Sequence, residues 1–457
     1  MLPKILSYWR LHKIPLVLLV LSFAFYYTFA YHLDRTNFLK LISLSAALFY
    51  LCYKLIQFEK WNFKLLLAAG ILFRVVFLFT EPMLSQDFYR FIWDGELLAQ
   101  GINPYLYTPD YIMQEGKIII ENAAQLYGGM GEISAKNYSN YPPLNQLIFG
   151  LAALFSGKSM FGGILTMKLF ILAADIGILY FGKKLLVKLN KSSHLIFWYF
   201  LNPLIIIELS GNLHFEGVML FFFIWAMYLI TEKKWRLSAP IFAFSIAVKL
   251  VPLLFLPLFL RHFGLKKTIL FYVLVGATLV VIFLPFISKE FILNYSQTIG
   301  LWFSNFEFNS SFYNIVKKLA ELNGSKNWET IKAFGKISPY ITIGVVLIFS
   351  FLTKNKKITG LFTSMLWVLC IYYFISTTVH PWYVIFVVLL SVFTKFRFAI
   401  VWSSAVFLSY WAYANPNYTE HLGILSIEYI SVFGFMIYEI LRLKRQNSLF
   451  PKNMAAH

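Results

Sequence analysis

The sequence predicts an all-helical integral membrane protein, and three features of its composition and patterning predict it. Of the 457 residues, 59% are hydrophobic and only 13% are charged. A soluble domain carries about 25% charged residues, which cover its surface with polar groups. Apolar runs of about 17 to 25 residues recur along the whole chain, which is the length of a helix that crosses a bilayer. We expect one polytopic bundle over residues 1–457, with about 12–14 transmembrane helices and long outer loops carrying short interfacial helices.

The formal net charge of +19 follows from the topology. Lys and Arg gather in the short links between apolar runs, as the positive-inside rule describes for cytoplasmic loops. No basic patch has interleaved aromatic residues, so we expect no nucleic acid partner. The two cysteines, Cys52 and Cys370, lie inside apolar runs and give no sign of a disulfide.

The first three apolar runs place the segment that follows them outside. The N-terminus is basic and is expected in the cytoplasm, and three spans follow at about 15–31, 38–56 and 62–80. Residues 81–160 then form a first outer loop. Within it, the short apolar stretch at about 144–155 is expected to lie along the interface, because the lysines after the run at about 164–186 then fall inside.

The rest of the chain continues this alternation. Residues 238–262 are expected to form two half-helices that climb to Lys249 and return, because the segment is longer than one span and has basic residues at both ends. A second outer loop is expected at 288–336. The remaining spans end inside and outside in turn, and the C-terminus falls in the cytoplasm. These spans include runs at about 194–209, 213–231, 268–287 and 421–441.

This topology brings the unusual polar residues to the outer side. They are Asp87, Arg90, Asp94, Asn103, His214, Glu216, Lys249, Asn309, His380 and Tyr383. Ionisable residues at such depths usually line a cavity rather than face lipid. The grouping therefore predicts an outward-facing pocket that takes a charged or heavily hydroxylated ligand.

Asp87 and Asp94 are candidate catalytic acids. They lie seven residues apart, so on a helix they share one face with Arg90 between them. One carboxylate could take a proton from a hydroxyl, while Arg90 or Lys249 binds a leaving phosphate. Either acid could instead cap a helix, and Lys249 could instead snorkel or pair with Glu208, so these alternatives stay open.

Two further pairs are binding candidates. His380 and Tyr383 lie in an HPWY sequence at the outer end of a span, where such residues either bind a ligand or form an aromatic belt. His214 and Glu216 lie close together on a loop and could hold a metal in principle. No HExxH or Cys/His spacing supports such a site, so we expect no metal and no cofactor.

Several short blocks, in the same order and on the same side, resemble GT-C-fold glycosyltransferases. The resemblance is strongest to bacterial polyprenol-phosphate-mannose-dependent mannosyltransferases and extends distantly to the GPI mannosyltransferase I catalytic subunit. Three spans precede the loop here, whereas many members have one, and the acids are not spaced as in the DxD form of the GPI enzyme. The blocks are DFYR (87–90), WDG (93–95), GINPY (101–105), YPPL (141–144), HFEG (214–217), AVKLVPLLFLP (247–257), FNSSFYN (308–314) and HPWY (380–383).

The resemblance implies a glycosyltransferase that moves a hexose, usually mannose, from a polyprenyl phosphate donor to an acceptor hydroxyl with inversion. Asp87 would be the general base, with the choice between Asp87 and Asp94 left open. The residues that would contact the donor phosphate or line the donor site are Arg90, Lys249, His380 and Tyr383, with His214 and Glu216 beside them. The acceptor would be lipid- or glycan-linked. The enzyme would lie in a bacterial inner membrane, with its site facing the periplasm.

Two alternatives remain. A flippase for a lipid-linked saccharide would place charged residues near the midplane, on broken helices and on both sides of the membrane. The sided polar residues argue against it. A polymerase or ligase of surface polysaccharide would move a whole glycan from a polyprenyl diphosphate, and the residues alone do not separate it from a transferase of single sugars.

Overall fold

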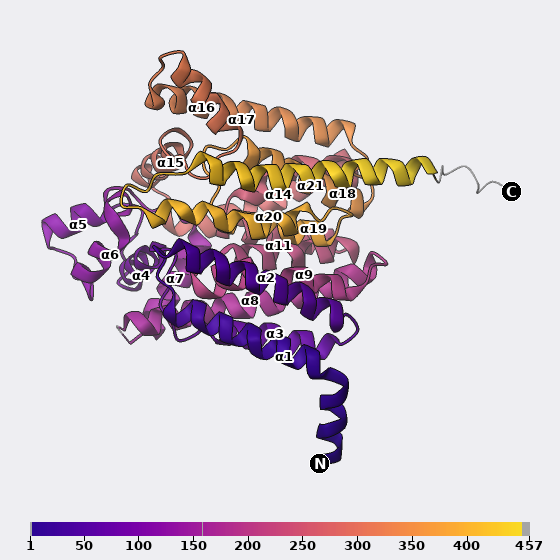
Figure 1. The fold of residues 1–457 in the computed structure, drawn as a ribbon. Coiled ribbons are helices and arrows are strands. Elements are labelled where there is room, and N and C mark those ends of the chain that lie inside the picture. Colours follow the sequence, from indigo (N-terminus) through magenta and orange to yellow (C-terminus); the bar gives the residue numbers. More distant parts are fainter. Residues whose placement is uncertain (1, 158, 450–457) are drawn as a thin grey trace.

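The computed structural model of this chain is a helical bundle, and it describes residues 2–157 and 159–449. Most helices run along one common direction (Figure 1). Within the described residues the β pairing consists of one isolated bridge, between Phe308 and Thr378. One cluster of buried apolar side chains extends along the chain from Tyr26 to Val432. The predicted all-helical polytopic class is confirmed.

Six helices in the described part of the chain are long and apolar enough to cross a membrane. They are α1 (Leu2–His32), α2 (Phe38–Phe58), α8 (Met160–Lys188), α14 (Leu265–Phe283), α17 (Asn327–Leu352) and α21 (Leu422–Leu449). The bent pair Ser193–Phe200 and Pro203–Gly211 makes a seventh if it counts as one span. The predicted total of about 12–14 crossings also counted segments that the structure builds as short apolar helices of 10–17 residues.

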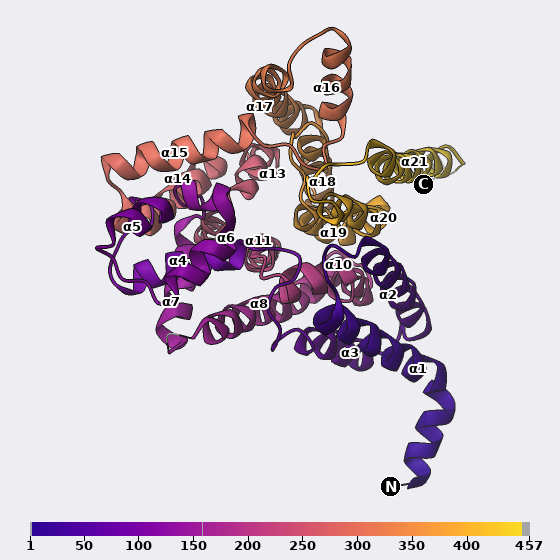
Figure 2. The same cartoon turned by 60° about the vertical axis from the view of Figure 1, so that its left-hand side comes forward.

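Most of the shorter helices lie among these spans, whereas α16 lies at the edge of the molecule beyond α17 (Figure 2). Several of them are interrupted by proline or by a change of helix type. They include α3 (Phe63–Val75), α9 (Phe197–Phe200), α10 (Pro203–Ile205), α11 (Glu216–Thr231), α12 (Trp235–Val248), α13 (Leu260–Phe263), α16 (Phe312–Leu322), α18 (Ile358–Phe374), α19 (Val384–Val392) and α20 (Phe398–Ala405).

Helix α3 ends before the predicted boundary at residue 80. Its last helical residue is Val75, and the chain then continues in turns. Lys168 of α8 is buried there and donates hydrogen bonds from Nζ to the carbonyl oxygens of Phe77 and Thr80, each at 2.5 Å. A helix end leaves carbonyl groups without intrahelical partners, and the buried ammonium supplies these hydrogen bonds in place of water.

A buried ion pair joins α3 to α8. Arg74 Nε donates to Asp175 Oδ2 at 2.8 Å, and both side chains are fully buried. Tyr199 donates its hydroxyl to the same carboxylate at 3.2 Å, and Arg74 also donates to the Phe200 carbonyl at 2.8 Å. Charges inside a membrane bundle are tolerated when they are paired in this way. Asp175 is therefore a packing partner within the bundle.

The predicted climb and return around Lys249 is confirmed. Helix α12 ends at Val248, and Lys249 is extended, with φ −148° and ψ 139°. The chain returns through a 3-10 segment, Val251–Phe259, and α13. The rings of Trp235 and Phe263 lie 6.2 Å apart, so the first and last residues of this broken element lie close together. Lys249 is thus placed at the tip of the break.

The basic links gather at one end of the bundle. Lys188 pairs with Glu232 at 2.8 Å, and Lys191 donates to the Phe393 carbonyl at 2.7 Å. The opposite end, here called the loop end, is formed by α4, α5, α6, α7 and α15, which lie together on the left of Figure 1. Their bounds are α4 (Asp87–Ala99), α5 (Pro109–Glu115), α6 (Ala123–Lys136), α7 (Pro143–Phe155) and α15 (Lys289–Ser304).

Helices α4 and α7 pack closely at the loop end. Helix α7 has 13 residues and is therefore too short to span a bilayer. A side chain at Gly95 of α4 would place its Cβ 2.4 Å from the carbonyl oxygen of Phe149 on α7. The missing side chain at this position lets the two backbones approach, and it fixes α4 against the bundle.

Substitution of Gly95 tests this contact. Gly95→Ala is expected to lower the thermal unfolding temperature of the detergent-solubilised protein, because overpacking against a backbone costs about 1–3 kcal/mol. Gly128→Ala on α6 is the control, since its Cβ would meet nothing within 4 Å. Equal unfolding temperatures for the two variants would contradict the close packing of α4 on α7.

Candidate active site

Asp87 is the first residue of α4 and has an uncommitted carboxylate. Its backbone N–H donates to Ser85 Oγ at 3.3 Å, whereas its side chain accepts no hydrogen bond from the described residues. Burial raises the pKa of Asp87 above its ordinary value, and the nearby His214 and Lys249 oppose this shift. The Asp87 carboxylate therefore lies near basic groups without a hydrogen bond to any of the described residues.

Lys249 lies at the break of α12 and faces the same region. It forms an ion pair with Glu216, the first residue of α11, which is buried. Its ammonium lies 5.4 Å from the centre of the Tyr383 ring, a distance typical of a cation–π contact. The alternative pairing of Lys249 with Glu208 is wrong, because Glu208 has other partners.

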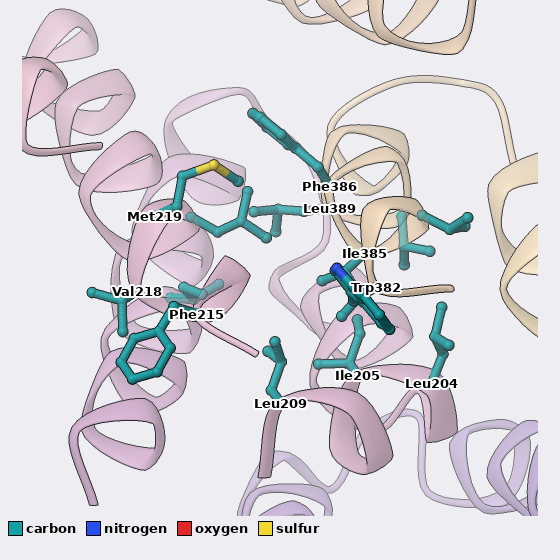
Figure 3. Packing of buried hydrophobic residues seen from close by; sticks show 14 of the residues in the cluster. Leu204, Ile205, Leu209, Phe215, Val218, Met219, Trp382, Ile385, Phe386 and Leu389 are labelled. Atoms are coloured by element: carbon teal, nitrogen blue, oxygen red, sulfur yellow. The ribbon is translucent and has the colours of Figure 1, made fainter. Parts of the chain in front are cut away.

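Four rings form a stack beside these charges, called the ring ladder below. Phe308 stacks on His380 with ring centres 5.0 Å apart, and His380 stacks on Trp382 at 4.4 Å. The indole of Trp382 stacks in turn on His214 at 3.7 Å. Figure 3 shows Trp382 beside Ile205 and Ile385, and all three side chains are buried. The ladder brings three separate blocks of the sequence together.

His380 is held as a neutral ring. Burial lowers the pKa of His380, and together with the nearby His214 and Lys249 it brings the pKa to about 3. Its Nδ1 is buried and has no hydrogen-bond partner among the described residues. A neutral imidazole with an unused nitrogen can donate or accept one hydrogen bond from a ligand.

Asp94 lies on the same helix as Asp87 but differs from it in burial and in hydrogen bonding. It is fully buried and accepts hydrogen bonds from Arg90 Nε at 2.7 Å, Ser139 Oγ at 2.5 Å and Gln146 Nε2 at 2.9 Å. These partners come from α4, from the loop before α7, and from α7 itself. Asp94 therefore joins the pieces of the first loop.

Arg90 is committed to the same loop. Besides Asp94, it donates to the carbonyl oxygens of Ser134 at 2.6 Å and Asn137 at 2.9 Å, at the end of α6. Its side chain is buried. The structure therefore brings together Asp87, His214, Glu216, Lys249, His380 and Tyr383, and it places Arg90 and Asp94 in a separate supporting network.

The FNSSFYN block is anchored from the end of the chain. Asn309 has a left-handed backbone with φ 49°, and its N–H donates to Glu420. Its side-chain Nδ2 donates to Glu428 at 3.2 Å, and its carbonyl accepts from Tyr429 at 2.5 Å. The sequence did not predict these partners, because they lie more than 100 residues away and nothing local marks them.

Among the residues that the structure describes, no group of three or more His, Cys, Asp or Glu side chains is arranged to hold a metal ion. His214 and Glu216, the one pair considered for this role, have other partners. Glu216 pairs with Lys249, and His214 lies against Glu208 with Nδ1 3.1 Å from Oε2.

The two acids are expected to affect stability in opposite directions. The pKa of Asp87 is raised above its ordinary 3.8, so its ionised form lowers stability as the pH rises above that value. Asp87→Asn should therefore raise the unfolding temperature at pH 7, and the gain should shrink toward pH 4. Asp94→Asn should lower it, because unpairing a buried Arg90 costs about 3–5 kcal/mol. Thermal unfolding across this pH range measures both, and a lower unfolding temperature for Asp87→Asn would contradict the assignment.

Residues 24–263 match the family model described as "Alpha-(1->6)-mannopyranosyltransferase, N-terminal domain". Alpha-(1->6)-mannopyranosyltransferase B of Corynebacterium glutamicum is 26% identical over 147 residues, which are 31% of this chain and 23% of that protein. Alpha-(1->6)-mannopyranosyltransferase A of Mycobacterium tuberculosis is 23% identical over 200 residues, 43% of this chain and 37% of that protein. The matched segments thus span well under half the length of these relatives.

No solved structure matches this chain. The residues that match the family model make up more than half of the chain, and they include Asp87, His214 and Lys249 but not His380. The chain therefore belongs to the alpha-(1->6)-mannopyranosyltransferase family.

Proposed function

We propose that this protein is a membrane mannosyltransferase that moves one mannosyl residue from a polyprenyl phosphate to an acceptor hydroxyl, with inversion. The observation that carries the proposal is the free carboxylate of Asp87 beside Lys249 and His214 at the loop end. The names of both curated relatives support mannose as the sugar. In this proposal residues 1–457 act as a single glycosyltransferase unit.

Asp87 is the general base of the proposed reaction. Its carboxylate takes the proton of the acceptor hydroxyl, whose oxygen bonds to the anomeric carbon of the sugar. The bond from that carbon to the phosphate oxygen breaks on the opposite side, and the electron pair leaves with the polyprenyl phosphate. A base whose pKa is raised toward neutral pH is better matched to this task than a fully hydrated carboxylate.

Lys249 and His214 bind the donor phosphate in this scheme. The positive charge of Lys249 neutralises the leaving group as it gains charge, and His214 contributes a hydrogen bond. Glu216 holds the Lys249 ammonium in place when no donor is bound. Arg90 is assigned to positioning instead, because its Nε and Nη1 donate to three acceptors within the first loop.

His380 and Tyr383 line the part of the site that binds the donor sugar. The imidazole is neutral and has a free Nδ1, so it suits a sugar hydroxyl better than a phosphate. The ring of Tyr383 lies at right angles to His380, with centres 5.4 Å apart. Two rings at this angle form a corner against which a pyranose can pack.

The site faces the periplasmic side of a bacterial inner membrane in this proposal. The basic links lie at the end of the bundle opposite to Asp87. The positive-inside rule assigns the end with the basic links to the cytoplasm, which leaves Asp87 on the other side. The donor remains in the bilayer through its lipid tail, and the acceptor is lipid- or glycan-linked. A flippase would need polar residues near the midplane, whereas the six that meet here lie near the loop end.

A transfer assay tests the activity. Purified protein in nanodiscs receives radiolabelled polyprenyl-phosphate mannose and a pool of lipid and glycan acceptors. Asp87→Asn is expected to lower turnover at least 100-fold, because general-base catalysis contributes about 10²–10⁴-fold to a rate. Glu132→Gln, an exposed acid on α6, is the control. Wild-type turnover in Asp87→Asn would remove this residue from the mechanism. Movement of labelled lipid between leaflets without product would favour a flippase.

The role of Lys249 has a separate test. Lys249→Met is expected to raise the donor KM by about 10- to 100-fold, because a hydrogen bond to a charged group contributes about 1.5–3 kcal/mol. Lys136→Met, an exposed lysine on α6 that pairs with Glu132, is the control. Steady-state rates over a range of donor concentrations measure the effect. An unchanged donor KM would show that the phosphate is bound elsewhere.

A further inference from the structure

Glu208 is a buried acid to which the proposed reaction gives no role. It is fully buried and lies in a π-helical turn, Ile206–Gly211, shortly before His214. Such turns are rare and are found mostly as local bulges, often at functional sites. An ionised carboxylate at this depth is costly unless several donors satisfy it.

Three groups surround the Glu208 carboxylate. Tyr410 donates its hydroxyl to Oε1 at 2.5 Å, and Asn212 donates Nδ2 to Oε2 at 3.3 Å. His214 Nδ1 lies 3.1 Å from Oε2 in an ion-pair contact. Two of these partners are within six residues of Glu208, whereas Tyr410 lies 202 residues away. The carboxylate thus joins the π-helical turn to a distant segment.

The backbone of Glu208 also holds His214. Its carbonyl accepts the His214 N–H at 3.2 Å. Between them Leu213 is fully buried and has a positive φ of 60°, a conformation that costs a bulky residue free energy. The chain therefore accepts local strain in order to bring the imidazole of His214 back beside the Glu208 side chain.

Neither ring nitrogen of His214 has a hydrogen-bond partner among the described residues, and both are buried. Nδ1 lies at ion-pair distance from Glu208, and Trp382 covers one ring face with ring centres 3.7 Å apart. Nε2 is therefore the nitrogen that has no ion-pair partner in the described part of the chain. His214 is only 3% exposed, and it is near enough to Asp87 to influence the pKa of that carboxyl. A buried, unpartnered nitrogen beside the base calls for a ligand oxygen.

The same network reaches the segment that carries Asp87. Asn212 donates to Glu208, and its Oδ1 accepts the backbone N–H of Leu84 at 3.0 Å. Leu84 is buried and lies three residues before Asp87. Glu208 therefore orients both His214 and the entry to α4.

We propose that Glu208 is a positioning residue of this site, which acts through His214 and Asn212 and aims His214 Nε2 at an oxygen of the donor's phosphate. The inference rests on the proposed function. Because Nδ1 lies against the Glu208 carboxylate and the backbone N–H of His214 donates to the Glu208 carbonyl, the ring is oriented so that Nε2 is the nitrogen left to contact an anion. If Glu208 were only a packing residue, its loss would affect stability without a specific effect on phosphate binding.

A double-mutant cycle separates these roles. The binding of polyprenyl phosphate, without a sugar, to the full chain in nanodiscs is measured for wild type, Glu208→Gln, His214→Gln and the double variant. Glu208→Gln is expected to weaken binding at least tenfold, and to have no further effect once His214 is replaced, because the two side chains act as one unit. Glu208→Asp should restore part of the affinity. Additive effects in the cycle would overturn the proposal.

Glu439→Gln is the matched control. Glu439 is also a buried acid with hydrogen-bond donors at both oxygens, but the donors are the backbone N–H groups of Arg397 and Phe398 at the other end of the bundle. Its substitution should leave polyprenyl phosphate binding within twofold of wild type, and an equal loss in both variants would also overturn the proposal. If Glu208→Gln does not fold, Tyr410→Phe, which removes the hydrogen bond to Oε1, must weaken binding about threefold.

This binding experiment is independent of turnover. If wild type binds polyprenyl phosphate and the cycle is non-additive but no mannose is transferred, the positioning role stands and the proposed transfer fails. If transfer is observed and the cycle is additive, the transfer stands and the role of Glu208 fails.

Discussion

The interior of this bundle must satisfy every polar group within the protein, since lipid offers no hydrogen bonds. Each helix interruption therefore requires a nearby side chain. Lys168 supplies hydrogen bonds to the carbonyl groups beyond α3, and Lys249 with Glu216 occupies the break after α12. The π-helical turn before α11 carries Glu208, which gathers Tyr410, Asn212 and His214. Buried polar side chains are therefore found beside the points where the helices are interrupted.

Two acids on one short helix illustrate how the surroundings divide residues of the same type. Asp94 is surrounded by donors and holds α4, the loop before α7 and α7 together. Asp87 has no such donors and lies among groups from the HFEG and AVKLVPLLFLP blocks. A carboxylate that accepts three hydrogen bonds is held in place, and its oxygens are not free to accept a proton from a ligand. The uncommitted one can take part in chemistry.

The sequence predicted the bundle well, because membrane helices are long apolar runs bounded by charge. Composition was sufficient for the fold class, and the basic links predicted that their loops share one end, which Lys188 with Glu232 and Lys191 with Phe393 confirm. The break at Lys249 was predicted from a segment too long for one span. The end of α3 at Val75 was not predicted, because the carbonyl partner that permits it comes from Lys168, 93 residues later (168 − 75).

By itself, the sequence determined the class of fold, and it predicted a set of polar residues of which the structure brings six together at the loop end. Periodicity, length and charge are local properties, so they can be read along the chain. Only the tertiary structure decided which of these residues are engaged: that Asp94 and Arg90 bond to each other, that Lys249 pairs with Glu216, and that Trp382 stacks between two histidines. These outcomes depend on distances between segments that are far apart in sequence, and no local pattern encodes them.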